Sequence, residues 1–271
     1  MNKVLKYVLI AAAIYFAAKL AGFFWSAVIL FAICIFIVYN RRAVIMTRMA
    51  MRAYFGGGDV KKGEQWFEKA YKTGEMTPEC KIAYSSFCLR ENKFERGKKL
   101  LNNVINSRYS SAEDKLGAKH NLAVLIWREG DLDGAIELME QVHKQMPTTA
   151  TYGTLGVLYL ERAKKSDAQA ALEFMLEAYD YNCDDKTIAD NLGELYLILG
   201  ENEKAKEVYD KLMEKELQTP VPYYNYGRVL KALGDNDGAK QRFEESLTKR
   251  FTSVMTVTRE AVQAELDSLS V

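Results

Sequence analysis

The chain has 271 residues, of which 37 are lysine or arginine and 36 are aspartate or glutamate, giving a net charge of +1. A nearly neutral chain lacks the basic excess typical of nucleic-acid binding proteins, so we expect no nucleic-acid partner. Its four cysteines show no Cys-x-x-Cys spacing and its two histidines are too few to complete a cluster with them, so we expect neither a metal site nor a disulfide framework.

The first predicted element is an apolar segment, residues 1–40, that contains three lysines and no acidic residue. Within it, the run from Leu20 to Tyr39 has 20 residues without a charge, and as a helix it would span about 30 Å, the thickness of a bilayer core. Apolar residues fall on every side of that helix and leave no polar face for water. The run therefore predicts a membrane-spanning helix over residues 20–39.

A shorter apolar run, residues 4–18, precedes this predicted span. One interpretation is a transmembrane helical hairpin, with a short first span, a tip near Lys19 to Gly22 and a full second span. The other interpretation is a single span. No proline or glycine separates Tyr39 from Thr47, so we expect the second span to run straight into the following helix.

Basic residues follow the second apolar run closely and predict the orientation of the chain, because such residues stay in the cytoplasm. These membrane-proximal residues are Arg41, Arg42, Arg48 and Arg52. We therefore expect an integral membrane protein whose remaining part faces the cytoplasm.

Beyond residue 44 the sequence repeats with a period of 34 residues. Gly193 and Gly227 are separated by this period, and so are Tyr209 and Phe243. Each copy has a small residue in a first helix, a glycine at a turn, and a small residue followed by an aromatic residue in a second helix. The residues expected to pack the repeats are Gly156, Tyr159, Leu192, Gly193, Tyr196, Ala205, Tyr209, Gly227, Ala239 and Phe243.

These residues resemble the tetratricopeptide repeat (TPR) family, whose unit is a 34-residue helix–turn–helix. The resemblance covers residues 44–253 as six repeats, of which the first two diverge because Met51 and Ser85 stand at the small position of the first helix. It implies an all-α fold, an α-solenoid that follows the membrane anchor. After the repeats, Val257, Val262 and Leu266 fall near one helical face, so we expect a capping helix over residues 254–269 that covers the last repeat. The expected repeats are 44–77, 78–115, 116–148, 149–185, 186–219 and 220–253.

In this family the first helices line a concave groove, and the resemblance implies that the groove binds a peptide or a partner protein. The asparagines that precede the small residue by two positions point away from the packing seam, and an amide can both donate to and accept from an extended backbone. The residues expected on the concave face are Asn121, Asn191, Asn225, Arg90, Arg128, Glu194, Arg228 and Lys231.

Catalytic chemistry is not expected. The glycine-rich stretch at residues 56–64 lacks the Gly-Lys-Ser/Thr ending of a phosphate loop, and no serine, histidine and aspartate can be grouped into a catalytic constellation. We therefore expect no enzyme activity, no cofactor and no small-molecule substrate.

The leading hypothesis is a membrane-anchored scaffold that recruits an unidentified protein or peptide, with the lipid bilayer as its second partner. Two alternatives stay open. The chain is an accessory subunit whose span docks in a membrane enzyme or transporter, or it is an envelope-assembly factor whose solenoid lies outside the cytoplasm.

Overall fold

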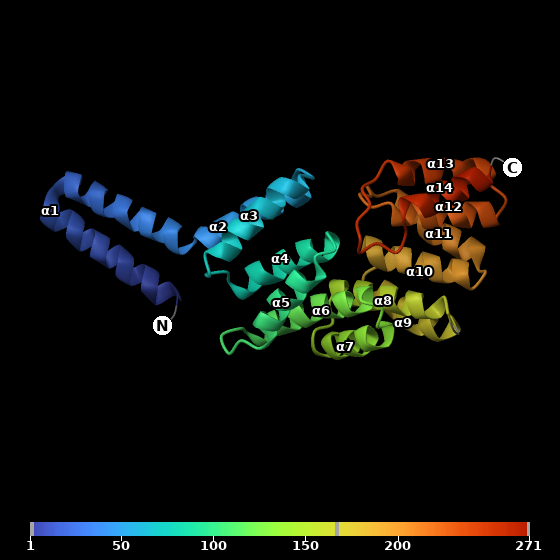
Figure 1. The fold of residues 1–271 in the computed structure, drawn as a ribbon, viewed down its shortest axis with the longest axis horizontal. Helices are drawn as coiled ribbons and strands as arrows, with labels where there is room; N and C mark the ends of the chain where they lie inside the picture. Colours follow the sequence, from blue (N-terminus) through green and yellow to red (C-terminus); the bar gives the residue numbers. More distant parts are fainter. Residues whose placement is uncertain (1–2, 166–167, 270–271) are drawn as a thin grey trace. The chain divides into compact units, whose positions relative to one another are not determined.

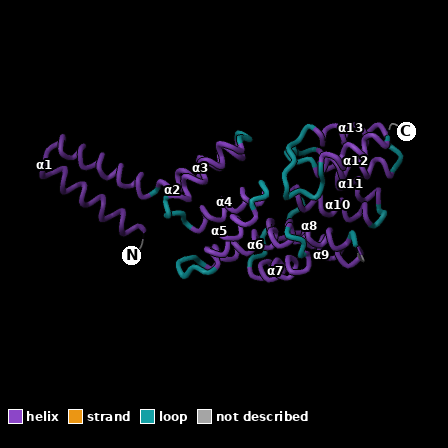
Figure 2. The backbone as a smooth tube through the Cα atoms, in the orientation of Figure 1, coloured by secondary structure: helices purple, strands orange, loops and turns teal. Residues whose placement is uncertain are grey.

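The computed structural model describes residues 3–165 and 168–269, and the side chains of residues 3–5, 20, 21, 23, 24 and 26 lie outside this description. The described residues form helices joined by short turns (Figure 1), and the tube drawing in Figure 2 shows the same helices and loops. The all-α class expected from the sequence is confirmed. The chain divides into two compact units, Met1–Ala83 and Tyr84–Val271, which we describe separately.

The first unit opens with α1 (Lys3–Asn40), which is broken at Gly22. Gly22 has φ 70° and ψ 167°, a backbone conformation that essentially only glycine adopts. Figure 1 shows the result as two helical arms joined by a sharp turn. The break lies within the tip that the hairpin interpretation placed near Lys19 to Gly22.

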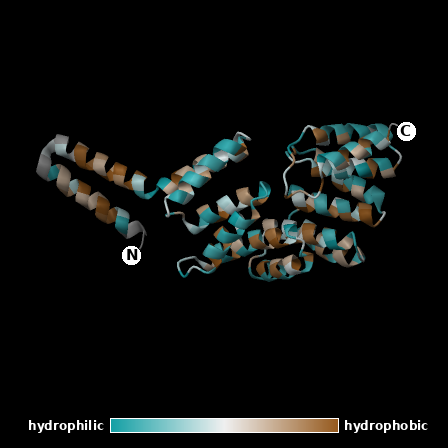
Figure 3. Cartoon of the chain, viewed as in Figure 1, coloured by the Kyte–Doolittle hydropathy of each residue, from teal (hydrophilic) through white to brown (hydrophobic). Residues whose placement is uncertain are grey.

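Both arms of α1 expose large apolar side chains. Figure 3 colours hydrophobic residues along both arms brown. Phe16 on the first arm is 67% exposed and Phe31 on the second is 68% exposed. Among the described residues, no single helix is long and apolar enough to cross a membrane; Ala27–Asn40 and Arg42–Gly56 reach this standard only as a pair, across a bend of 61°.

The expectation that the second apolar run continues straight into the next helix is wrong. α1 ends at Asn40, and the helical axes before and after this joint differ by 61° where α2 (Arg42–Met51) begins. The amide nitrogen of Asn40 donates to the carbonyl of Phe36 at 2.8 Å, and the guanidinium of Arg42 donates to that of Tyr39 at 3.0 Å. These side chains compete with the helix ladder for the last carbonyls and end the helix without a proline or glycine.

The remainder of the first unit is a helix pair. α2 continues into a π-helical turn, η1 (Arg52–Gly56), and both pack against α3 (Val60–Lys72). A Cβ atom on Gly63 would lie 2.9 Å from the Cβ of Tyr54, so the glycine allows α3 to approach this closely.

The second unit is a stack of antiparallel helix pairs. From α6 onward, first helices pack on their own second helix and on the next first helix: α8 contacts α9 and α10, and α10 contacts α11 and α12. The elements are the end of α4 (Pro78–Arg90), α5 (Phe94–Ile105), α6 (Ala112–Arg128), α7 (Leu132–Gln145), α8 (Thr149–Ala163), η2 (Ala168–Ala171), α9 (Leu172–Tyr181), α10 (Lys186–Ile198), α11 (Asn202–Met213), α12 (Val221–Ala232), α13 (Asn236–Leu247) and α14 (Arg259–Ser268).

Aromatic rings of the second helices pack directly on glycines of the first helices. A Cβ on Gly193 would lie 2.6 Å from Cε2 of Tyr209, and a Cβ on Gly227 would lie 2.5 Å from Cε1 of Phe243. These separations are far below a carbon–carbon contact, so only glycine admits the ring. The alanines Ala205 and Ala239, which open the second helices, and Leu192 on α10 are buried beside these contacts.

The other residues expected to pack the repeats make different contacts. A Cβ on Gly156 would meet Nδ2 of Asn191 at 2.5 Å, so this glycine makes room for a polar side chain of the next pair. Tyr159 and Tyr196 are partly buried, and the hydroxyl of Tyr159 donates to Glu140 at 2.7 Å.

The C-terminal helix α14 packs on α13, but it is shorter than the capping helix expected over residues 254–269. It begins at Arg259, where the hydroxyl of Thr258 accepts a hydrogen bond from the backbone N–H of Ala261 at 3.2 Å. The residues before it form a loop that returns to the end of α4.

We call residues 250–257 the strap. The hydroxyl of Ser253 donates to the carbonyl of Leu89 at 2.7 Å and lies 2.9 Å from that of Arg90. Arg250 pairs with Glu91 at 3.2 Å. The strap therefore connects the last helix pair of the second unit to its first helix.

Candidate binding groove

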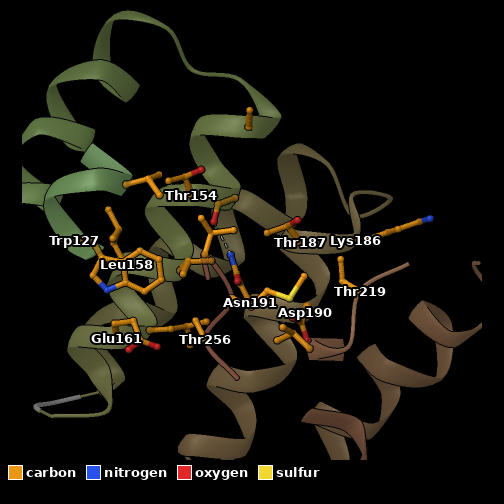
Figure 4. Close-up of a pocket in the computed structure, with 18 of the residues that line it drawn as sticks. Trp127, Thr154, Leu158, Glu161, Lys186, Thr187, Asp190, Asn191, Thr219 and Thr256 are labelled. Carbon is orange, nitrogen blue, oxygen red and sulfur yellow. Dashed lines mark hydrogen bonds between the residues drawn. The ribbon is translucent and has the colours of Figure 1, made fainter. Parts of the chain in front are cut away.

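The first helices of the second unit line a cavity of about 680 Å³, which we call the groove. Its walls come from α4, α6, α8, α10 and the start of α12, and residues 254–256 of the strap also line it. Figure 4 shows residues from several of these elements around the cavity, among them Trp127, Leu158 and Asn191. The groove is therefore built on stacked helices, which hold its side chains more precisely than free loops would.

Four of the eight residues expected on the concave face line the groove: Arg90, Asn121, Asn191 and Glu194. The two asparagines already link successive first helices. Nδ2 of Asn121 donates to Ser86 at 2.9 Å, and Nδ2 of Asn191 donates to the carbonyl of Gly153 at 2.9 Å. The asparagine position thus serves the stacking of the repeats, and in Asn191 it does so through Nδ2 rather than through the carbonyl Oδ1.

The remaining four are not among the groove residues, and their contacts explain why. Asn225 is only 2% exposed, and its amide donates to Asp190 and to Glu194, each at 3.2 Å, so it offers nothing to a ligand. The ammonium of Lys231 donates to Glu265 at 2.7 Å and holds α14. Asn225 and Lys231 thus both have acidic partners on neighbouring helices.

Arg128 and Arg228 lie over aromatic rings of their own helices. The guanidinium carbon of Arg128 is 5.2 Å from the ring centroid of Trp127, and that of Arg228 is 5.6 Å from the centroid of Tyr224. Such stacking directs the guanidinium along the helix surface. Burial lowers the pKa of Arg128, an effect that Glu161 partly offsets.

A buried acidic network forms one wall of the groove. Asp190 is 8% exposed, and its Oδ1 accepts hydrogen bonds from the hydroxyl of Tyr209 at 2.9 Å and from Asn225 at 3.2 Å. Nearby, Lys164 bridges Glu194 at 2.9 Å and Glu161 at 2.7 Å. Burial and the charge of Glu194 raise the pKa of Asp190 from 3.8 to about 7.

The opposite wall is neutral and partly apolar. Nε2 of His120 lies 2.8 Å from the hydroxyl of Thr154, and burial lowers the pKa of His120 below 6.5, so the imidazole is neutral at pH 7. Trp127 and Leu158 add apolar surface (Figure 4). The groove is therefore acidic along α10 and, apart from Glu161 at the end of α8, uncharged along α6 and α8.

The four arginines that follow α1 belong to the first unit. Arg42 pairs with Glu75 at 2.8 Å and lies 3.9 Å from the ring centroid of Tyr39. Arg41, Arg48 and Arg52 are exposed.

Several groove residues were not predicted from the sequence, although the repeat pattern points to at least one of them. Thr154 stands two residues before Gly156, the position at which α6 and α10 carry Asn121 and Asn191. A search for asparagine alone passes over it, whereas alignment on the small residue finds it. The strap residues carried no such signal.

Family models of the tetratricopeptide repeat match residues 188–214 and 222–248, and another model of the same repeat matches residues 116–141. These segments cover α10 with α11, α12 with α13, and α6 with the start of α7. The chain is a tetratricopeptide repeat protein.

Solved structures support the same fold for this TPR protein. A thermophilic TPR protein of Thermus thermophilus is 15% identical with a TM-score of 0.58, and the match covers 72% of this chain and 99% of that one. PilF of Pseudomonas aeruginosa is 13% identical with a TM-score of 0.55, covering 84% and 99%. A chain of the Cut9–Hcn1 hetero-tetramer of APC/C is 14% identical with a TM-score of 0.63, covering 89% and 45%.

Identities this low show the fold alone. No curated protein sequence matches the TPR protein.

Proposed function

We propose that this TPR protein is a non-enzymatic scaffold that α1 anchors to a membrane and whose groove binds an extended segment of a partner protein on the cytoplasmic side. TPR proteins generally act as protein-interaction scaffolds, and their stacked repeats form concave binding surfaces. The observation that carries the proposal is the groove itself. It joins five first helices over a volume of about 680 Å³ and has both polar and apolar walls.

The dimensions and lining of the groove favour a polypeptide segment as its guest. Binding sites for ligands combine apolar walls with a few placed polar groups, and the groove offers Trp127 and Leu158 for the first and Asn191 and Thr154 for the second. The polar groups come from successive helices, as an extended chain that crosses the helices requires.

The exposed apolar surface of α1 supports membrane anchoring. Aromatic and aliphatic side chains on both arms, such as Phe16 and Phe31, have no protein cover, and contiguous apolar surface of this kind marks contact with a membrane or a partner. The exposed Arg41, Arg48 and Arg52 follow α1 directly, which favours the cytoplasmic side for the remainder of the chain.

Photo-crosslinking in the native membrane tests the scaffold proposal. Benzoylphenylalanine replaces Thr154, which lines the groove, or Gln141, an exposed residue of α7, as the matched control. We expect specific protein adducts from position 154 and none of these from position 141. Equal adducts from both positions, or none from the groove, contradict the proposal. Adducts formed only through α1 favour an accessory subunit of a membrane complex.

Anchoring and orientation need their own measurements. Carbonate extraction should leave the full chain in the membrane pellet and release a chain without residues 1–40. The exposed Cys183 then reports the side of the membrane, whereas Cys80 is buried and unsuitable. A membrane-impermeant maleimide should leave Cys183 unlabelled in intact cells, and rapid labelling would favour the envelope-assembly alternative.

A further inference from the structure

Two acceptor atoms at the groove wall have no hydrogen-bond partner within the described part of the chain. They are Oδ2 of Asp190 and Oδ1 of Asn191, and the two residues are 8% and 3% exposed. Their orientation is fixed, because Oδ1 of Asp190 holds the hydroxyl of Tyr209 and Nδ2 of Asn191 holds the carbonyl of Gly153. Figure 4 shows Asp190 and Asn191 side by side at the cavity. Neither oxygen is fully enclosed by the protein, so a ligand in the groove can reach both acceptors and donate to them.

Charge points to a cation as that donor. Carboxylates outnumber cations among the groove residues: Glu161, Asp185, Asp190 and Glu194 stand against Arg90 and Lys186. Lys164, outside the lining, pairs with both Glu161 and Glu194 and offsets one of their two charges, while Asp185 accepts the backbone N–H groups that start α10. Lys186 is directed at the carbonyl of Glu216. Among the described groove residues, Asp190 is the carboxylate that neither forms an ion pair nor caps a helix, although the charge of Lys164 acts on it from nearby.

We propose, building on the function proposed above, that the groove receives a lysine side chain of the bound segment, whose ammonium donates to Oδ2 of Asp190 and Oδ1 of Asn191. An ammonium carries three donors and no acceptor, which suits two separate acceptor atoms. A guanidinium that forms two parallel hydrogen bonds to a carboxylate needs both of its oxygens, and Oδ1 of Asp190 already accepts from the hydroxyl of Tyr209. The aliphatic stem of lysine matches apolar lining residues such as Val157 and Leu158.

The ionisation of Asp190 gives this contact a pH dependence. Burial and Glu194 on the same helix raise the pKa of Asp190 to about 7, whereas hydrogen bonds from Tyr209 of α11 and Asn225 of α12 and the charge of Lys164 after α8 lower it. A bound ammonium adds one more cation to this set and stabilises the ionised form. Lysine binding therefore strengthens as the pH rises from 6.5 to 8.5. Over this range His120 of α6, whose pKa burial lowers below 6.5, stays largely neutral.

Selection from a random heptapeptide library displayed on phage, against the full chain in nanodiscs, tests the proposal. Asp190→Asn keeps the shape of the side chain and removes its charge, and Glu207→Gln removes a carboxylate from the exposed face of α11 as the matched control. We expect the wild type and Glu207→Gln to enrich lysine at one peptide position at least tenfold over the library at pH 8.5. Asp190→Asn should not enrich lysine.

Each other outcome counts against a defined part of the proposal. Selected peptides with no lysine preference, or with arginine as frequent as lysine, overturn the lysine contact and leave groove binding intact. Lysine enrichment that persists in Asp190→Asn overturns the assignment to Asp190. Failure of the wild type to select any peptide overturns the contact together with the proposed function.

A second measurement does not depend on the folding of a variant. In a selected peptide, norleucine replaces the lysine and keeps the aliphatic stem without the ammonium. Calorimetric titration of the full chain should show at least a tenfold weaker affinity for the norleucine peptide at pH 8.5 and a smaller difference at pH 6.5. Equal affinities for the two peptides, or a difference that does not change with pH, would overturn the proposal.

Discussion

The helix pairs α10–α11 and α12–α13 share one backbone plan and differ in chemistry at matching positions. In both pairs a ring of the second helix packs on a glycine of the first. In α10–α11 the ring is Tyr209, whose hydroxyl donates to Asp190, whereas in α12–α13 it is Phe243, which faces the ring of Tyr224 at a centroid distance of 6.0 Å. The glycine–ring contact holds each pair together. The position that the ring contacts next differs: it is the buried carboxylate Asp190 in α10 and the aromatic residue Tyr224 in α12.

Leucine at Gly193 or at Gly227 should give the largest loss of stability, because each side chain would displace a packed ring. We expect the free energy of unfolding to fall by about 3 kcal/mol in each case, at the upper end for overpacked cores. Urea denaturation of the full chain in detergent measures it.

Gly153→Ala is the matched control for the two leucine variants, since a Cβ there would lie 3.3 Å from Cγ2 of Thr187, the tip of a side chain. It should change the free energy of unfolding by less than about 1 kcal/mol. A loss in the control as large as that of the leucine variants would show that ring packing does not distinguish these glycines.

Asn191 of α10 and Asn225 of α12 stand at matching positions, but we expect their removal to cost different amounts of stability. Asn225→Ala removes one donor from each of two buried carboxylates and should cost about 2–3 kcal/mol, whereas Asn191→Ala removes one bond to a neutral carbonyl and should cost about 1–2 kcal/mol. Chemical denaturation of both variants at pH 8, where carboxylates are ionised, compares them. A greater cost for Asn191→Ala would reverse the comparison.

Asp190→Asn removes the buried carboxylate of α10, a group that the matching residue of α12, Tyr224, does not have. Between about pH 4 and pH 7 the folded chain keeps a proton on Asp190, whose pKa is raised to about 7, while the unfolded chain has released it near its ordinary pKa of 3.8. The contribution of Asp190 to stability is therefore full below pH 3.8 and is lost as the pH rises to about 7. The variant should lose this slope and gain stability relative to the wild type over that range. Parallel pH profiles for wild type and variant would contradict the assignment, and Glu207→Gln should keep the wild-type profile.

The smallest effect is expected where α12 meets α14. Lys231→Met removes the bond to Glu265, a partly exposed ion pair, and should cost less than about 1 kcal/mol. Its signature is faster hydrogen exchange in α14. Lys206→Met removes a pair within α11, with Asp210, and should leave exchange in α14 unchanged.

The sequence predicts the repeated helix pairs well because their causes are local. Small residues at a 34-residue spacing and aromatic residues after them determine which helix faces meet, and Gly193 and Tyr209 meet as this spacing requires. The break of α1 at Gly22 likewise falls where the apolar runs change. In contrast, the bend after Asn40 depends on side chains that bond to nearby carbonyls, which hydropathy does not reveal.

Contacts between residues that are distant in sequence explain the features that the sequence did not predict. Position within the repeat placed Asn225 on the ligand face, but the carboxylates that bury its amide lie 31 and 35 residues away. The sequence predicts residues 254–257 of the strap as the start of the capping helix, because Val257 fits the helical pattern of the tail, whereas in the structure they belong to a loop in which Ser253 bonds to Leu89 across 164 residues. No local pattern encodes such a contact.

The strap has a kinetic consequence for the second unit. In an open stack each repeat touches only its neighbours, so a bound segment can leave sideways as fast as its contacts break. The bonds of Ser253 and Arg250 to the end of α4 close one side of that path. For a segment bound as proposed, the dwell time would then depend on how often the strap detaches from α4. Affinity and residence time would thus be set by different residues, the first by the groove lining and the second by Arg250 and Ser253, which hold the strap to α4 and are not among the lining residues.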